Sequence, residues 1–241
     1  MGNNARALTA AAAAVILALS AAAAEEPKHS PMKREAAEKF LETIVAARAE
    51  VKTIAARFKH TSTSFLLAEP TVSKGYLRVR KPDWIRRDIL EPSRSALVLK
   101  ASAGAFCQPG QKPRTFDLNE TKGSDVAGTI LRLLIGEKFD LTELEKRFGV
   151  KTFAVGDDLM LELKPKEQAL AEKLPVLRIT FRPKGIWPKR VEWESRDGDS
   201  FADEFGEPAV DSELPDAVFS AQVNWKEKLT PASADPEAGD G

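Results

Sequence analysis

Residues 72–109, VSKGYLRVRKPDWIRRDILEPSRSALVLKASAGAFCQP, set the architecture of this chain. They divide into four short extended segments, at 75–80, 84–90, 96–100 and 105–107. Turns that contain proline, at 81–83 and 91–93, separate the first three segments. Strands of this length with a turn after each one predict an antiparallel meander within an all-β sheet or barrel.

One face of this meander is apolar. Leu77 and Val79 alternate with polar residues in the first segment, and Ile85 and Ile89 do so in the second. Arg87 falls between these two isoleucines, so strand alternation places it on the same face. A sheet with one apolar face needs something to cover that face. We expect a ligand to form part of the cover.

The rest of the chain adds helices and further strands. An apolar stripe in residues 32–52 predicts an amphipathic helix, and a long strand is expected at 53–65. Two central helices follow, one capped at Ser124 or Asp125 and one capped at Asp140 and stopped by Gly149. The later strands are expected at 150–155, 159–164, 174–181, 186–196 and 200–205. The fold class is therefore α+β and mainly β, with about ten or eleven strands and three helices.

Composition divides the chain into four regions. Residues 1–24 combine a basic start, an alanine-rich apolar run and an A-x-A cleavage site, which predicts a secretory signal peptide and a periplasmic location. Residues 25–34 are expected to be a flexible lead, 35–225 one folded domain, and 226–241 a disordered polar tail. The 36 basic and 36 acidic residues balance, so no charge excess points to nucleic acid.

Several short motifs stand in a specific order along the chain: Phe58, Gly75, Leu77, Val79, Lys81-Pro82, Pro92 and Leu214-Pro215-Asp216-Ala217-Val218-Phe219. Together with the order of the elements, over about residues 35–222, this pattern resembles the LolA-type carriers of outer-membrane lipoproteins. The resemblance implies an unclosed β-barrel, or half-barrel, with helices as a lid on its open side. It also implies a monomer that takes acylated lipoproteins across the periplasm, from an inner-membrane ABC exporter to an outer-membrane receptor.

The chain departs from that family pattern at the lid contact. Members carry Lys-Arg-Pro in the meander, and the resemblance implies that the arginine holds the lid closed. Here the order is Arg80-Lys81-Pro82, so Lys81 and the inward-facing Arg87 are the expected lid contacts. Lysine lacks the planar fork of arginine and is a weaker clasp for carbonyl groups. A cargo other than a lipoprotein, such as another lipid or a glycolipid, therefore stays open.

A lipid carrier needs a large apolar surface. Burial of one methylene group is worth about 0.8 kcal/mol, so a sixteen-carbon chain carries roughly 12 kcal/mol of hydrophobic free energy. We expect the inward side chains of the early strands and one central helix to line a hollow for such chains. These residues are Ile54, Phe58, Leu77, Val79, Ile85, Ile89, Val98, Ile130, Leu133 and Leu134.

Other interpretations remain possible from sequence alone. The apolar face is plain core if no ligand enters, and a register slip of one residue would put Lys81 and Arg87 outside. Two histidines, His29 and His60, give no basis for a metal site or a catalytic triad, and no phosphate loop is found. We therefore expect no enzyme activity and no cofactor. Residues 192–204 are expected to form a solvated acidic face or, less simply, a calcium site, and Cys107 a small buried hydrophobe. A lipoprotein-sensing regulator of similar fold is a further alternative.

Overall fold

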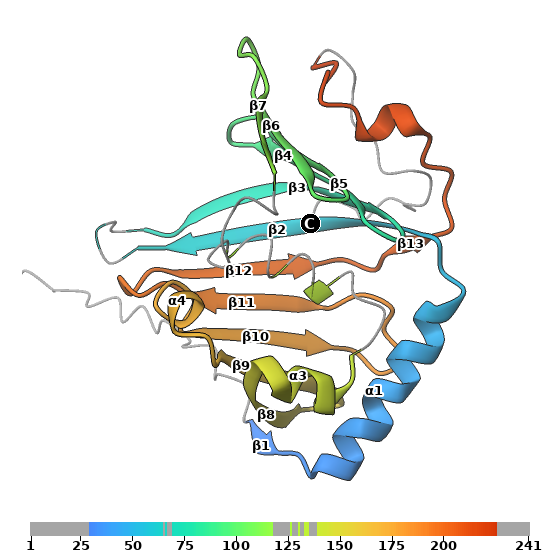
Figure 1. Cartoon of the computed structure of the whole chain (residues 1–241), viewed down its shortest axis with the longest axis vertical. Coiled ribbons are helices and arrows are strands. Elements are labelled where there is room, and N and C mark those ends of the chain that lie inside the picture. Colours follow the sequence, from blue (N-terminus) through green and yellow to red (C-terminus); the bar gives the residue numbers. More distant parts are fainter. Residues whose placement is uncertain are drawn as a thin grey trace, which may run out of the picture.

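A single curved antiparallel sheet dominates the computed structural model, which describes residues 29–64, 66, 69–117, 126, 130, 133–134 and 139–225. The strand order is β1-β8-β9-β10-β11-β12-β2-β3-β4-β5-β6-β7, and β13 pairs with β2 beside this path. The two end strands, β1 and β7, do not pair with each other, so the sheet is not closed (Figure 1). The predicted fold class, a mainly-β unclosed barrel, is confirmed.

The strands follow the sequence prediction closely. The first seven are β1 (Ser30–Pro31), β2 (Thr53–Thr63), β3 (Thr71–Arg80), β4 (Trp84–Glu91), β5 (Ser95–Lys100), β6 (Ala103–Cys107) and β7 (Arg114–Asp117). The others are β8 (Phe148–Val155), β9 (Asp158–Pro165), β10 (Val176–Phe181), β11 (Arg190–Glu194), β12 (Ser200–Phe205) and β13 (Ala209–Val210). The described residues thus contain thirteen strands rather than ten or eleven. The added ones, β1 and β13, have two residues each, too few for an alternating pattern to reveal.

The described helices are α1 (Arg34–Ala49), α3 (Leu141–Arg147), α4 (Gln168–Ala171) and the 3-10 helix η1 (Asp216–Phe219). Asp140 caps α3 as predicted, because its side chain accepts hydrogen bonds from the backbone N–H groups of Thr142 and Glu143. The predicted stop at Gly149 is wrong. Phe148 already opens β8 opposite Pro165, and its buried ring holds the chain in the sheet. The predicted cap at Ser124 or Asp125 lies outside the described residues.

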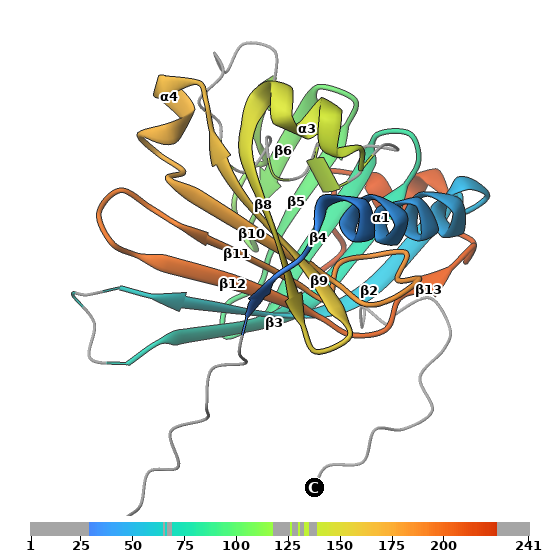
Figure 2. The same cartoon turned by 90° about the horizontal axis from the view of Figure 1, so that it is seen from below.

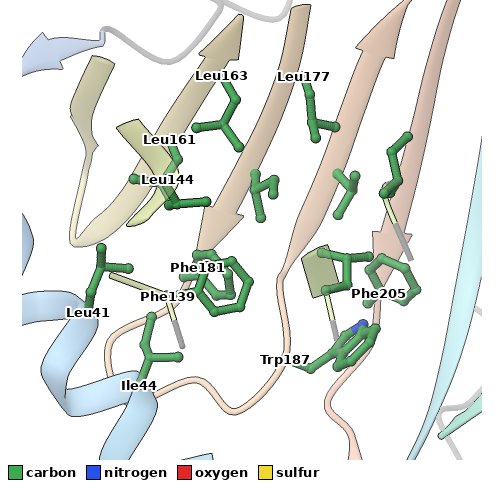
Figure 3. Close-up of a cluster of buried hydrophobic side chains, with 14 of the residues drawn as sticks. Leu41, Ile44, Phe139, Leu144, Leu161, Leu163, Leu177, Phe181, Trp187 and Phe205 are labelled. Atoms are coloured by element: carbon green, nitrogen blue, oxygen red, sulfur yellow. The ribbon is translucent and has the colours of Figure 1, made fainter. Parts of the chain in front are cut away.

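Helices α1 and α3 cover the concave side of the sheet, which we call the inner face (Figure 2). From α1, Leu41 and Ile44 point into the same cluster as Leu144 of α3, Phe139 and the leucines of β9 and β10 (Figure 3). Phe139 and Phe181 meet edge to face, with ring centroids 4.9 Å apart. This cluster runs without interruption from β9 to β4, so the inner face and its helical cover form one core.

The convex side, or outer face, of β3 to β6 is covered by residues 211–225, which we call the C-terminal strap. Arg80 of β3 donates to the carbonyl of Leu214, and Arg86 of β4 donates to that of Val218. The buried ring of Phe219 meets Trp84 edge to face. At the far end of the strap, the Cys107 thiol donates to the carbonyl of Ala221, and burial raises the pKa of this thiol. Cys107 is thus a buried side chain, as predicted.

Charged side chains also lie on the outer face. Asp88 is fully buried between Arg78 and Arg86, with N–O distances of 2.7 and 2.9 Å. Burial lowers the pKa of Arg78, while Asp88 acts in the opposite direction. On β9 to β12 the outer face carries an ion-pair ladder, in which Arg178 bridges Glu162 and Glu194. No helix within the described residues is long and apolar enough to cross a membrane.

Candidate functional site

The inner face brings together most of the residues that were predicted to line a hollow. Ile54 and Phe58 of β2, Leu77 and Val79 of β3, and Ile85 of β4 belong to one buried cluster, each at most 4% exposed. Register explains the grouping, because Ile54 lies opposite Val79, which in turn lies opposite Ile85. Ile89 is partly buried and packs against the same cluster.

Val98 does not belong to this group, and its placement on the inner face was wrong. It lies opposite Arg86 in the β4–β5 pair, whereas Leu99 lies opposite Ile85. Val98 therefore faces outward, where it packs with Leu214 and Phe219 of the C-terminal strap. In β5 the inward residues are Leu97 and Leu99, which pack in the main cluster.

Helical residues complete the cover of the inner face. Ile130 and Leu134 are buried in the main cluster, and Leu133 is partly buried against it. A groove of about 590 Å³ opens between α1 and the start of α3. It is lined by Leu41, Val45, Phe139 and Leu141 as well as the acidic residues Glu38 and Glu42. Three of these apolar residues, Leu41, Phe139 and Leu141, also belong to the main cluster, so the groove leads from solvent to the core. Its volume falls within the range of roughly 300–1,000 Å³ typical of ligand pockets.

Polar residues interrupt the inner face at one place. Arg87 lies on this face, as strand alternation predicted, but it contacts β12 rather than a helix. Its Nη2 lies 2.9 Å from Asp203 Oδ1, and its guanidinium lies over the ring of Phe58. His60 Nδ1 lies 2.7 Å from the same Asp203 oxygen. The described contacts of Arg87 are thus with Asp203 and Phe58, and its lid contact stays a prediction. Asp203 is 13% exposed and is not part of a solvated acidic face.

Lys81 meets a helix, although not a central one. Its ammonium group lies 2.5 Å from the carbonyl oxygen of Arg48, near the end of α1. A cation at a helix C-terminus interacts favourably with the unpaired carbonyl groups of the last turn. Lys81 thus ties β3 to the helix that covers the inner face.

A family model described as "Outer membrane lipoprotein carrier protein LolA" matches residues 49–222, which include every strand from β2 to β13 and the predicted lid residues. The chain belongs to the LolA family. Members of this family are carrier or binding proteins for lipoproteins or lipids, and they work outside the cytoplasm. A search of curated proteins found no match.

Three solved structures are among those similar to this chain. A LolA superfamily protein from Nitrosomonas europaea is 12% identical at a TM-score of 0.41, with 76% of this chain and 97% of that one covered. The lipoprotein LppX from Mycobacterium tuberculosis is 9% identical at a TM-score of 0.44, with coverage of 76% and 99%. In the Pseudomonas aeruginosa MucA/MucB complex the identity is 13% and the TM-score 0.40, with coverage of 77% and 60%.

Arg48, which joins α1 to the helical residue Leu134, was missed in the sequence analysis. Arg48 is 2% exposed, and its Nη2 lies 2.7 Å from the carbonyl oxygen of Leu134. Its guanidinium also lies over the ring of Phe139, 5.2 Å from the centroid. The signal was present in the sequence, because Arg48 continues the apolar stripe of Leu41 and Ile44 by one turn.

The described part of this LolA-family chain offers no group of three or more His, Cys, Asp or Glu side chains placed to hold a metal ion. Among the described residues, the buried polar atoms without a hydrogen-bond partner include one donor within the main cluster. The indole Nε1 of Trp187 makes no hydrogen bond, although the ring is 1% exposed and packs against Phe205. A buried donor without an acceptor costs about 1–3 kcal/mol, which a ligand carbonyl would relieve.

Proposed function

We propose that this protein is a periplasmic carrier that shields the acyl chains of lipoproteins and takes them from the inner to the outer membrane. One observation carries the proposal: a single apolar cluster joins the inner face of the sheet to its helical cover. A helix can move away from a sheet without breaking the backbone hydrogen bonds that hold the strands together. The cover can therefore open while the sheet stays intact.

The free-energy cost of moving the helical cover away from the sheet is low when a ligand replaces the apolar contacts that are lost. An acyl chain that enters between the sheet and its cover replaces the contacts that Leu41, Ile44 and Ile130 make with the sheet. Free in water, a sixteen-carbon chain exposes roughly 12 kcal/mol of hydrophobic free energy, which favours its transfer into such a site. The groove beside Leu41 and Phe139 is a suitable entrance.

The sequence supports the periplasmic location in this proposal, and family membership supports the membrane partners. The alanine-rich residues 1–24 have the pattern of a signal peptide for export to the periplasm. By analogy with the LolA family, the donor is an inner-membrane ABC-type exporter and the acceptor an outer-membrane receptor.

Binding of an acyl probe to delipidated protein tests the proposal. We expect the wild-type protein to bind a fluorescent fatty acid, and Leu133→Asp to weaken this binding about tenfold or more, because a carboxylate in an apolar cover is costly. Leu66→Asp is the matched control, since Leu66 is 77% exposed. Equal affinity of the wild type and Leu133→Asp would contradict the proposal. Mass spectrometry of the protein purified from its own periplasm would then identify the natural cargo.

A second candidate function, a carrier of another lipid or of a glycolipid, is favoured by one specific observation. The inner face carries three ionisable side chains, His60, Arg87 and Asp203. A site for acyl chains alone would be apolar throughout, so these side chains favour a ligand with a polar head group.

A further inference from the structure

The polar interruption of the inner face continues directly from its apolar part. Along β2, His60 follows Phe58 by two residues and so lies on the same face. Along β12, Asp203 precedes the apolar Phe205 by two residues and lies opposite His60 in the register. The apolar and polar zones thus lie next to each other along the same two strands. An amphiphilic molecule could place its tail against one zone and its head group against the other.

The three polar side chains are half-buried and leave bonding capacity unused. Their side chains are 17%, 20% and 13% exposed for His60, Arg87 and Asp203. The single oxygen Asp203 Oδ1 takes part in both contacts. Within the described residues, no hydrogen bond is found for Asp203 Oδ2, His60 Nε2, or Arg87 Nε and Nη1. A carboxylate only accepts, so His60 Nδ1 carries the proton in its contact with Asp203, and Nε2 is left for a further hydrogen bond.

Aromatic rings stand beside these groups on the same face. Trp193 of β11 and Phe201 of β12 stack with their centroids 5.3 Å apart and their planes at 15°. His60 extends the stack, 6.2 Å from Phe201 and 5.8 Å from Trp193. Both Trp193 and Phe201 remain partly exposed. We call the five residues His60, Arg87, Trp193, Phe201 and Asp203 the head-group cluster.

We propose that the head-group cluster binds the uncharged, hydroxyl-rich head group of an acyl ligand, such as the sugar of a glycolipid. This proposal rests on the acyl-chain binding proposed above. Hydroxyl groups both donate and accept, so they can bond to the acceptor Asp203 Oδ2, to the donors of Arg87, and to His60 Nε2 in either of its roles. The C–H face of a sugar packs on aromatic rings. An ionised phosphate head group can bond to Arg87, but it fits less well because it offers no donor to Asp203 Oδ2 and is repelled by this carboxylate.

Displacement of a fluorescent fatty acid by three dodecyl compounds tests this assignment. Dodecyl maltoside, dodecyl phosphate and dodecanol share one chain and are used below their micelle-forming concentrations. We expect the wild type to bind the maltoside about tenfold more tightly than the phosphate or the alcohol. Asp203→Asn and Trp193→Leu should each remove most of this preference and leave dodecanol binding unchanged. Glu204→Gln is the matched control, since Glu204 is the next residue of β12 and faces outward.

The outcomes separate the two proposals. If none of the dodecyl compounds or the fatty acid binds to the wild type, the proposed acyl-chain carrier fails, and the head-group assignment fails with it. If the chains bind but the wild type does not prefer the maltoside, only the head-group cluster loses its assigned role. A preference for dodecyl phosphate, or an equal loss in Asp203→Asn and Glu204→Gln, would also overturn the assignment. Because dodecanol binding reports an intact inner face, a variant that retains it has folded.

Discussion

Gly75 shows how strongly a single position constrains this sheet. It lies opposite Ile89, next to an irregularity in the β3–β4 register, and the ring of Phe58 covers it. A Cβ atom built on Gly75 would lie 1.8 Å from the carbonyl oxygen of Asp88 and 2.9 Å from the Phe58 ring. Only a glycine lets the two strands and this ring approach so closely.

We predict that Gly75→Ala lowers the free energy of unfolding by about 2 kcal/mol or more, because a strand or the Phe58 ring must shift. Urea denaturation measures this change. Gly149→Ala in β8 is the control, since its nearest neighbour would lie 3.8 Å from the new Cβ. That variant should be unchanged or slightly more stable. A Gly75→Ala protein as stable as the control would show that the two strands can separate without cost.

Strand alternation predicted some residues correctly and failed at others for a physical reason. In β4, Arg87 stands two residues from both Ile85 and Ile89, so its inward position could be read from the sequence. In β5, the run Ala96-Leu97-Val98-Leu99 is apolar throughout, because its inner side meets the core and its outer side meets the C-terminal strap. Such a run carries no sign of which residues point inward, and Val98 was assigned to the wrong face.

The head-group cluster was missed for a related reason. His60 and Asp203 lie 143 positions apart in the chain and meet only because β12 pairs with β2. No local pattern predicts this pairing. The inward position of His60 could have been predicted, because it follows Phe58 by two residues in β2. Its contact with Asp203 could not have been predicted from the sequence.

At the level of elements, α1 is the centre of the polar contacts that hold the cover. Arg48 of α1 donates to the carbonyl of Leu134, and the carbonyl of Arg48 accepts from Lys81 of the β3–β4 turn. The sheet, α1 and the helical residue Leu134 are therefore linked in series by two hydrogen bonds.

We predict that Arg48→Met loosens the cover while the sheet remains folded. The change keeps much of the apolar stem but leaves the Leu134 carbonyl without its 2.7 Å donor, a loss of about 1–3 kcal/mol. Amide hydrogen exchange near residues 130–134 should accelerate, and a bound fatty acid should dissociate about tenfold faster.

Arg34→Met is the control for this experiment. Arg34 also belongs to α1, but its ion pairs with Glu38 and Glu145 are exposed and contribute little. Unchanged exchange and release in Arg48→Met would mean that apolar packing alone holds the cover in place.

Elements with their own local signals were predicted well. The Asp140 cap of α3 and the long strands β2 to β4 could be located from residue types alone. The ends of elements were harder to predict, because packing decides them. Phe148 continues the apolar stripe of α3, yet its pairing with Pro165 places it in β8. The stripe expected for α1 included Val51, which lies beyond the end of the helix.

For the whole molecule, the continuity of the apolar cluster connects ligand binding with stability. The cluster includes residues of the sheet, α1 and α3, so a ligand bound within it contacts only the folded chain. We predict that a fatty acid at about one hundred times its dissociation constant raises the free energy of unfolding of delipidated protein by about 2.7 kcal/mol. Thermal unfolding with and without ligand measures this effect.

The same scan on Leu133→Asp provides the control for ligand stabilisation. This variant should unfold at a temperature that the fatty acid hardly changes, since its cover carries a charge. A ligand that raises the unfolding temperature of both proteins equally would have to bind elsewhere.

The unclosed sheet gives this protein a freedom that a closed barrel lacks. In a closed barrel, every strand is bonded on both sides, so strand number and stagger fix the circumference. Here β1 and β7 are free of each other, and the curvature can flatten or tighten through small changes of twist along the whole sheet. For the proposed carrier, this means that ligands of different width fit one scaffold without the loss of a single inter-strand hydrogen bond.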